Sequence, residues 1–155
     1  LFLPRDITHP RVVKAWIAEM DRGGMISLVA VRKGRIVGTA ALVRDAFFWS
    51  KHVAELRIVV APEARKTGLG RQLLQELFAI ALAENIEKIT AQMTTDQVGA
   101  IAMFESIGFK AEGLLRDAVK DANGKPHDIV IMGNIIAQTF ARLEALGILG
   151  AAAAE

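Results

Sequence analysis

The sequence predicts one α/β domain of the α+β type, in which a mixed, mostly antiparallel central sheet carries helices on both faces. Two observations support this class. Helical patterns and β-rich runs follow the order helix, two strands, a third strand, helix, strand, helix, two strands, helix. Of the 155 residues, 52% are hydrophobic and 23% charged, as is typical of a compact domain. No linker or repeat divides residues 1–149, and we treat 150–155 as a low-complexity tail.

The first elements are a helix and a hairpin. Apolar positions along one side indicate a helix over residues 8–21, which ends before the glycine pair at 23–24. Two β-rich runs, 26–32 and 36–43, flank Lys33-Gly34, and this turn signal is typical of a hairpin. We expect these two strands to be antiparallel.

The middle of the chain predicts a strand, a helix and another strand. The third strand, 54–60, ends before Pro62 because proline cannot donate to a sheet ladder. A helix over residues 69–84 leads to a strand at 87–93. Because a helical crossover connects them, these two strands should be parallel neighbours.

The last third predicts a helix, a hairpin and a terminal helix. Residues 96–108 read as a helix closed by Gly108. A hairpin of strands 109–119 and 127–134 follows around the turn segment DANGK. The last predicted helix covers 135–149.

Composition excludes several classes of function. The chain has no cysteine, which rules out disulfides, thiolate metal sites and a cysteine nucleophile. Its three histidines, His9, His52 and His127, lie far apart, so no metal site is predicted. A net charge of +2 with dispersed basic residues argues against nucleic acid as a partner. No apolar run reaches the roughly 20 residues that cross a bilayer, so we expect no membrane association and a cytoplasmic location.

A basic, glycine-punctuated turn, VVAPEARKTGLG at residues 59–70, connects the third strand to the second helix. Free backbone N–H groups and the helix dipole converge at such a turn and make it an anion site. A Walker P-loop requires Lys-Ser or Lys-Thr after its last glycine, where this chain has Arg71-Gln72. A dinucleotide fingerprint requires a third glycine, where Leu73 stands. The turn therefore differs from both familiar nucleotide motifs.

Two motifs in the chain resemble those of one enzyme family. The pattern Arg65-x-x-Gly68-x-Gly70 after Val60-x-Pro62 is similar to motif A of the GNAT superfamily of acyl-CoA-dependent N-acyltransferases, which reads Arg/Gln-x-x-Gly-x-Gly/Ala. The segment AIAMFESIGF, residues 100–109, resembles the second hallmark, a helix ending in Gly-Phe after an aromatic residue. Both occur in the expected order within a matching series of elements from about residue 26 to residue 132. The resemblance implies a GNAT-like fold and acetyl-CoA as cofactor.

By this resemblance, the pyrophosphate of CoA would bind the backbone N–H groups of residues 66–71, with basic side chains adding charge. A Cβ at Gly68 or Gly70 would block the close approach or the backbone angles that the turn needs. The pantetheine arm would lie in a V where strand 54–60 splays from strand 87–93. The residues implied in cofactor binding are Ile58, Val59, Val60, Arg65, Lys66, Thr67, Gly68, Leu69, Gly70, Arg71, Gln97 and Phe104.

Direct acyl transfer needs a neutral amine, whereas an amine like that of lysine has a pKa of about 10.4, so a base must take its proton. Glu55 is the candidate, since several members of the family place a catalytic carboxylate on this strand. The alternative role for Glu55 is an ion pair with Arg57, two residues on and so on the same strand face. Asp96 is expected to cap the following helix. His52 and His127 are expected to be exposed loop residues.

The chain departs from the family pattern at two positions. Phe104 stands where members often have a tyrosine that protonates the departing CoA thiolate, and the chain has no tyrosine. We expect Phe104 to contact the cofactor or the core, and water to serve as the proton source. Gln97 stands where an asparagine is common, which keeps the amide but lengthens its reach.

The resemblance thus implies N-acetyl transfer from acetyl-CoA to a primary amine by direct attack, with Glu55 or a water that it polarises as base. The acceptor would be a small-molecule amine or a peptide or protein amine. The aromatic run Phe47, Phe48 and Trp49 either packs inward, lines an amine pocket or forms a homodimer contact. Two other functions stay open: a non-catalytic acyl-CoA sensor or partner module, and a nucleotide-binding protein.

Overall fold

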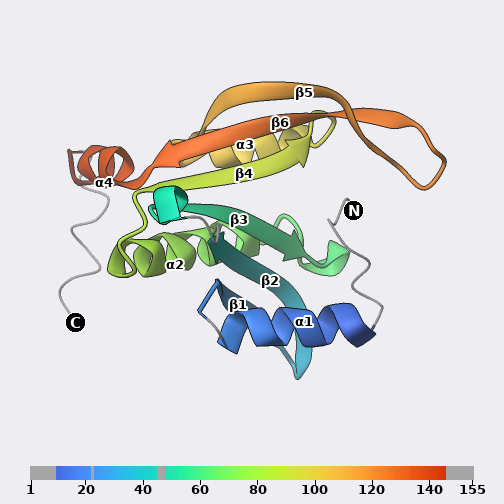
Figure 1. Ribbon diagram of the computed structural model, residues 1–155, viewed down its shortest axis with the longest axis horizontal. Helices are drawn as coiled ribbons and strands as arrows, with labels where there is room; N and C mark the ends of the chain where they lie inside the picture. The colour runs from blue at the N-terminus through green and yellow to red at the C-terminus, as the bar shows by residue number, and fades with distance from the viewer. Residues whose placement is uncertain (1–9, 22, 45–47, 146–155) are drawn as a thin grey trace.

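The computed structural model describes residues 10–21, 23–44 and 48–145. Within these ranges the chain forms a six-stranded sheet and four α-helices (Figure 1). Two short 3-10 turns, Phe48–Ser50 and Pro62–Ala64, precede and follow β3. The helices and strands are α1 Pro10–Asp21, β1 Met25–Arg32, β2 Arg35–Arg44, β3 Val53–Val60, α2 Leu69–Ala83, β4 Lys88–Thr94, α3 Val98–Ser106, β5 Lys110–Lys120, β6 Pro126–Ile135 and α4 Ile136–Ala145.

The sheet has the strand order β1-β2-β3-β4-β6-β5. Only β3 and β4 pair in parallel among the described strands, because α2 carries the chain back across the sheet between them. The other four pairings are antiparallel. The predicted hairpins, the parallel crossover and the mixed, mostly antiparallel sheet are therefore confirmed.

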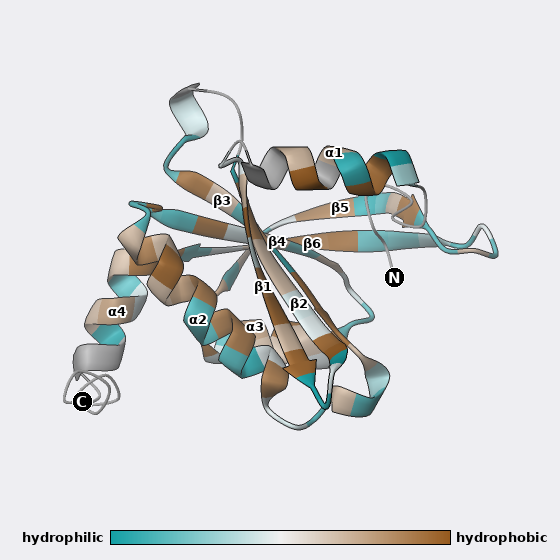
Figure 2. Cartoon of the chain, turned by 90° about the horizontal axis from the view of Figure 1, so that it is seen from below, coloured by the Kyte–Doolittle hydropathy of each residue, from teal (hydrophilic) through white to brown (hydrophobic). Residues whose placement is uncertain are grey.

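Helices cover both faces of this sheet. Figure 2 shows α1 on one side of the strands and α2 and α3 on the other. Alternate residues of the central strands point to the α2 side, where Leu42, Leu56, Ile89 and Met132 are fully or almost fully buried. Leu74 and Leu77 of α2 pack in the same core. The main core therefore lies between the sheet and α2 and α3, so the opposite face of β3 and β4 is available to other roles.

Sequence and structure differ by one or two residues at most element boundaries. Asp96 is not a helix cap, because α3 begins after Gln97, whose own side chain makes no capping hydrogen bond. Of the aromatic run, only the Trp49 side chain lies within the described part of the chain, and it is 77% exposed. Residues 146–155 lie outside the described ranges, and with them the tail and the last residues predicted as helix. Across the described segments, no helix has the length and apolarity needed to cross a bilayer.

Candidate functional site: a cleft between diverging strands and a basic turn

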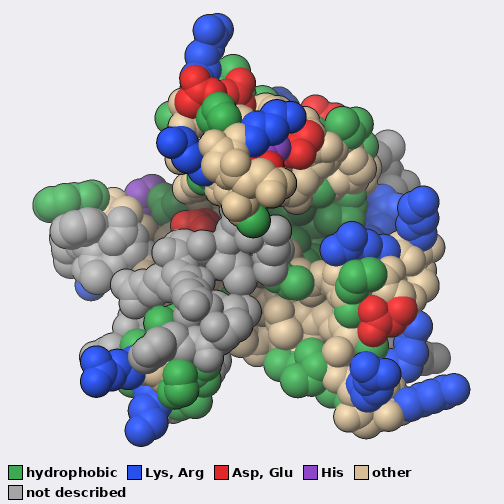
Figure 3. Space-filling view, turned by 90° about the vertical axis from the view of Figure 1, so that its right-hand side faces the viewer, with side chains coloured by type: hydrophobic (Ala, Val, Ile, Leu, Met, Phe, Trp, Pro, Cys, Tyr) green, Lys and Arg blue, Asp and Glu red, His purple; other side chains and the backbone are tan. Residues whose placement is uncertain are grey.

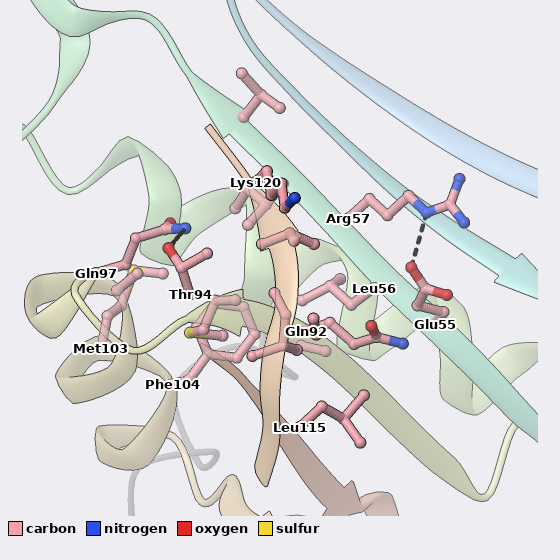
Figure 4. A pocket seen from close by; sticks show the side chains of 18 residues that line it. Glu55, Leu56, Arg57, Gln92, Thr94, Gln97, Met103, Phe104, Leu115 and Lys120 are labelled. Atoms are coloured by element: carbon pink, nitrogen blue, oxygen red, sulfur yellow. Dashed lines mark hydrogen bonds and ion pairs between the residues drawn. The ribbon is translucent and has the colours of Figure 1, made fainter. Parts of the chain in front are cut away.

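The parallel pairing of β3 with β4 stops at Leu56 and Ala91. Beyond that point β3 stays paired with β2 as far as Val60, and β4 stays paired with β6 as far as Thr94. The two strands therefore diverge, and a cavity of about 660 Å³ opens where they part (Figure 4). The splayed V that the sequence suggested is present at this place.

The backbone of β3 offers hydrogen-bonding groups to the V at every second residue. The Ala61 N–H donates to Val37 O at 2.9 Å, which fixes Val59 as a residue whose N–H and C=O face β2. The backbone groups of Ile58 and Val60 face the other way, into the V. The prediction for Val59 is therefore wrong as to its backbone groups, which pair with Thr39, although Val59 still lines the cavity.

The basic turn follows directly after β3 and its proline. Gly68 has φ +85°, a left-handed conformation that side chains with a Cβ rarely adopt, and it caps the N-terminus of α2. The first helical hydrogen bond runs from Gln72 N–H to Gly68 O at 3.0 Å. The N–H groups of Leu69, Gly70 and Arg71 therefore have no intrahelical acceptor and point out of the helix end. This arrangement suits an anionic phosphate.

The side chains of the turn add charge and order. Arg65, Lys66 and Arg71 are all exposed, and Lys66 has φ +60°. The Arg65 Nε donates to Val60 O at 3.3 Å, which holds this guanidinium beside the end of the V. The Thr67 hydroxyl donates to Ala64 O at 2.7 Å and fixes the turn itself. Figure 3 shows a hollow on this side of the molecule, with hydrophobic side chains inside and Lys and Arg side chains on its rim.

Gly70 differs from Gly68 in what it requires. Its φ lies outside the left-handed region, and a Cβ added there would meet the Met103 sulfur at 3.4 Å, an ordinary contact. The expectation that the chain needs a glycine here is therefore wrong for the conformation of the turn. Of the two positions, only Gly68 requires a glycine, because of its left-handed φ angle.

Glu55 and Arg57 lie on the same side of β3, as strand alternation predicted, and both line the cavity. The Arg57 Nε donates to Glu55 Oε1 at 2.9 Å, with about a third of each side chain exposed. The ion pair that the sequence offered as the alternative role of Glu55 is thus present. It also places the carboxylate at the cavity wall, where Figure 4 shows Gln92 of β4 pointing toward it.

One face of α3 forms a second wall of the cavity. Gln97, Ala100, Met103 and Phe104 line it at helical spacing. Phe104 is only 2% exposed and makes an edge contact with Phe109, with ring centroids 4.8 Å apart. The Gln97 Nε2 donates to the Thr94 hydroxyl at 2.8 Å. Phe104 therefore serves the core and the cavity wall together, and the nearest polar groups on this wall are an amide and a hydroxyl.

The sequence missed the third wall, which β5 supplies. Leu115 of β5 pairs with Ile129 of β6, and the next pair is Val119 with His127. Four residues of β5 therefore span the same distance as two residues of β6, so β5 carries a bulge. Asp117, at φ +49°, lies in this bulge, and its N–H donates to Asp128 Oδ1 at 2.8 Å. The bulged segment lines the cavity through Leu115, Ala118, Val119 and Lys120. No pattern in the sequence reveals the bulge, because the residues of β5 are almost all exposed.

His127 is more enclosed than the sequence suggested. Its side chain is 16% exposed on β6, with Nε2 3.2 Å from Asp121 Oδ2 and Nδ1 3.8 Å from Asp96 Oδ2. The hydrogen bond with His127 and backbone N–H groups lower the pKa of Asp121. The Thr94 side chain, and then the charges of His127 and Lys125, lower the pKa of Asp96. The expectation of an exposed loop histidine is therefore wrong for His127, whereas His52 is exposed as expected.

Comparison with known proteins identifies the family of this chain. The family model described as Acetyltransferase (GNAT) family matches residues 2–109, more than half of the chain. The chain belongs to the GNAT acetyltransferase family. This family uses acetyl-CoA as acyl donor, as the resemblance implied, and the GNAT fold is confirmed.

The chain is also similar to solved structures and curated relatives that are acetyltransferases. The ribosomal-protein-alanine N-acetyltransferase from Brucella melitensis is 31% identical, with a TM-score of 0.74 over 81% of this chain and 77% of that one. A GNAT superfamily phosphinothricin acetyltransferase from Sinorhizobium meliloti, solved in complex with AcCoA, has a TM-score of 0.73 at 24% identity over 82% of this chain and 70% of that one. N-acetyltransferase family 8 member 3 of Rattus norvegicus is 24% identical over 111 residues, 72% of this chain and 44% of that protein. The chain spans less than half the length of the curated relatives it matches.

Proposed function

We propose that this protein transfers the acetyl group of acetyl-CoA to a primary amine by direct attack, with Glu55, or a water that it polarises, as the base. The observation that carries the proposal is the cavity itself. It lies where β3 and β4 diverge, a carboxylate stands in its wall, and an anion-binding helix end follows β3. These parts suit a long anionic thioester and a separate amine.

The described residues offer groups that suit two parts of the cofactor, its pyrophosphate and its pantetheine arm. The open N–H groups at the start of α2 would hold the pyrophosphate, and Arg65 and Lys66 would add charge. The backbone N–H and C=O of Ile58 and the N–H of Val60 would hold the amides of the pantetheine arm. Acetyl-CoA supplies the acetyl group as an activated thioester.

Glu55 can take a proton without leaving its ion pair. Arg57 engages only Oε1 among the contacts of the described residues, so Oε2 is left to accept an amine proton directly or through water. Phe104 has no proton to give to the sulfur. The leaving thiolate would take its proton from water on the wall formed by Thr94 and Gln97.

A non-catalytic acyl-CoA-binding module is the second candidate. The observation that favours it is Phe104, because a buried phenyl ring occupies the place of the usual acid. Release of free thiol from acetyl-CoA, measured against amines, polyamines, antibiotics and peptides, separates the two functions. Coenzyme A binding without thiol release for any acceptor would establish the binding module.

The role of Glu55 has its own test. Glu55→Gln should lower turnover about 100-fold or more, the usual contribution of a general base, while the Kd for coenzyme A stays unchanged. The matched control is Glu76→Gln, an exposed carboxylate on α2 that does not line the cavity. An unchanged rate of Glu55→Gln at every pH would remove Glu55 from the mechanism.

A further inference from the structure

We infer that the acceptor is a free α-amino acid or a similar small zwitterion, and that Arg57 binds its carboxylate. This inference rests on the acetyl transfer proposed above and names its substrate class. It starts from the two opposite charges that β3 presents to the cavity. Glu55 and Arg57 are two residues apart, lie on one face of the strand and are joined at 2.9 Å.

The guanidinium of Arg57 is only partly used. Its Nε donates to Glu55, whereas its two terminal nitrogens have no acceptor among the residues that the structure describes. Guanidinium groups bind carboxylates through two parallel N–H bonds, and this open edge provides such a pair of donors. Because about 30% of the Arg57 side chain is exposed, a small anion can reach it.

Both charges lie on the face of the sheet that is opposite α2 and α3. Leu56 and Ala91 pair in the register and are buried toward α2 and α3, so Arg57 and Gln92 point to the opposite face. Figure 4 shows Glu55, Arg57 and Gln92 together on this side of the diverging strands. An acceptor that approaches from this face therefore meets a carboxylate, a guanidinium and an amide at once.

The charge of the cavity selects against polycations. Its described lining contains two cations, Arg57 and Lys120, and one carboxylate, Glu55. Lys120 makes no ion pair with any described residue. A polyamine would meet net positive charge, and the terminal amine of a peptide has no carboxylate beside it. A zwitterion satisfies both members of the Glu55–Arg57 pair.

Glu55 and Arg57 would have separate roles in the reaction, one toward the amine and one toward the carboxylate of the acceptor. In an α-amino acid one carbon separates the amine from the carboxylate, which matches neighbouring partners on one strand face. One ammonium proton of the zwitterion first passes to Glu55, directly or through water, and frees the lone pair of the nitrogen. The neutral amine nitrogen then bonds to the thioester carbonyl carbon, the carbon–sulfur bond breaks, and the nitrogen loses a second proton to solvent. The sulfur takes a proton from solvent, and Arg57 holds the carboxylate throughout. Leu115, Val119 and Ile129 give the remaining wall an apolar character that suits an aliphatic side chain.

The test compares each L-amino acid with its carboxamide, with spermidine as a polycation, by release of free thiol from acetyl-CoA. The accepted amino acid should exceed its amide in kcat/KM by about 10- to 100-fold, the usual contribution of a charge-assisted hydrogen bond. Arg57→Gln should raise KM more for the acid than for the amide and so remove this preference, and Arg57→Lys should restore part of it. Lys110→Gln, which removes a positive charge outside the cavity, is the matched control.

The possible results distinguish a wrong substrate class from a wrong transferase function. Thiol release with amides or spermidine equal to or better than the acids would overturn the substrate class and leave acetyl transfer standing. The same holds if Arg57→Gln lowers the rates of acid and amide equally, since that would show a structural role. No thiol release from any acceptor, with coenzyme A bound, would overturn the transferase function and this inference together.

Discussion

Gly68→Ala tests the link between the conformation of the basic turn and cofactor binding. Gly68 has φ +85° and nothing lies within 4 Å of the Cβ that alanine would add, so the substitution brings backbone strain without a clash. Left-handed backbone costs a residue with a Cβ about 1–2 kcal/mol, and restricting the unfolded chain returns about 0.4–1 kcal/mol. The net loss of about 1 kcal/mol should lower Tm by about 2–4 °C in a domain of this size.

The same variant should raise KM for acetyl-CoA, because relaxation of the strain turns the N–H groups of Leu69 and Gly70 away from the pyrophosphate. Gly34→Ala is the matched control, since Gly34 has φ +74°, equally open surroundings and a place in the distant β1–β2 turn. Thermal unfolding followed by circular dichroism and steady-state kinetics measure both effects. A Gly68→Ala protein that loses the same Tm as Gly34→Ala and keeps the native KM would refute the phosphate role of the turn.

Four further variants extend these expectations. Gly70→Ala should stabilise the fold by about 0.5 kcal/mol, because glycine weakens a helix, with KM for acetyl-CoA unchanged; a loss of stability in urea unfolding would show that the added methyl group does not fit beside Met103. Arg65→Ala should raise that KM about tenfold by removing a charged donor, and an unaltered KM would contradict the pyrophosphate assignment. Phe104→Ala should cost about 3 kcal/mol in urea unfolding, since the ring is 2% exposed; a loss below about 1 kcal/mol would mean that Phe104 does not support the core. Asp121→Asn should make Tm depend less on pH at acid pH. The folded pKa of Asp121 is lowered from 3.8, so its stabilisation is present above that value and disappears as pH falls through the folded pKa; Tm values that fall equally in both proteins below pH 3.8 would show that Asp121 contributes nothing there.

The sequence by itself determined the elements and half of the site. Hydrophobic periodicity, the Lys33-Gly34 turn and Pro62 located the strands and helices within one or two residues, because these signals act between near neighbours in the chain. The glycine spacing of residues 65–70 predicted the anion-binding helix end for the same local reason. The residues proposed to hold the pyrophosphate are thus contiguous in sequence.

Only the tertiary structure decided how the other walls of the cavity are formed. The end of the β3–β4 pairing, the direction of Val59, the bulge that brings Leu115 to Lys120 over the cavity and the enclosure of His127 all depend on partners on other strands. The sequence offered Glu55 either as a base or as the partner of Arg57, and the structure shows the ion pair on the cavity wall. Strand pairing over long sequence distances sets which edge and which face a residue presents, and no local pattern records that choice.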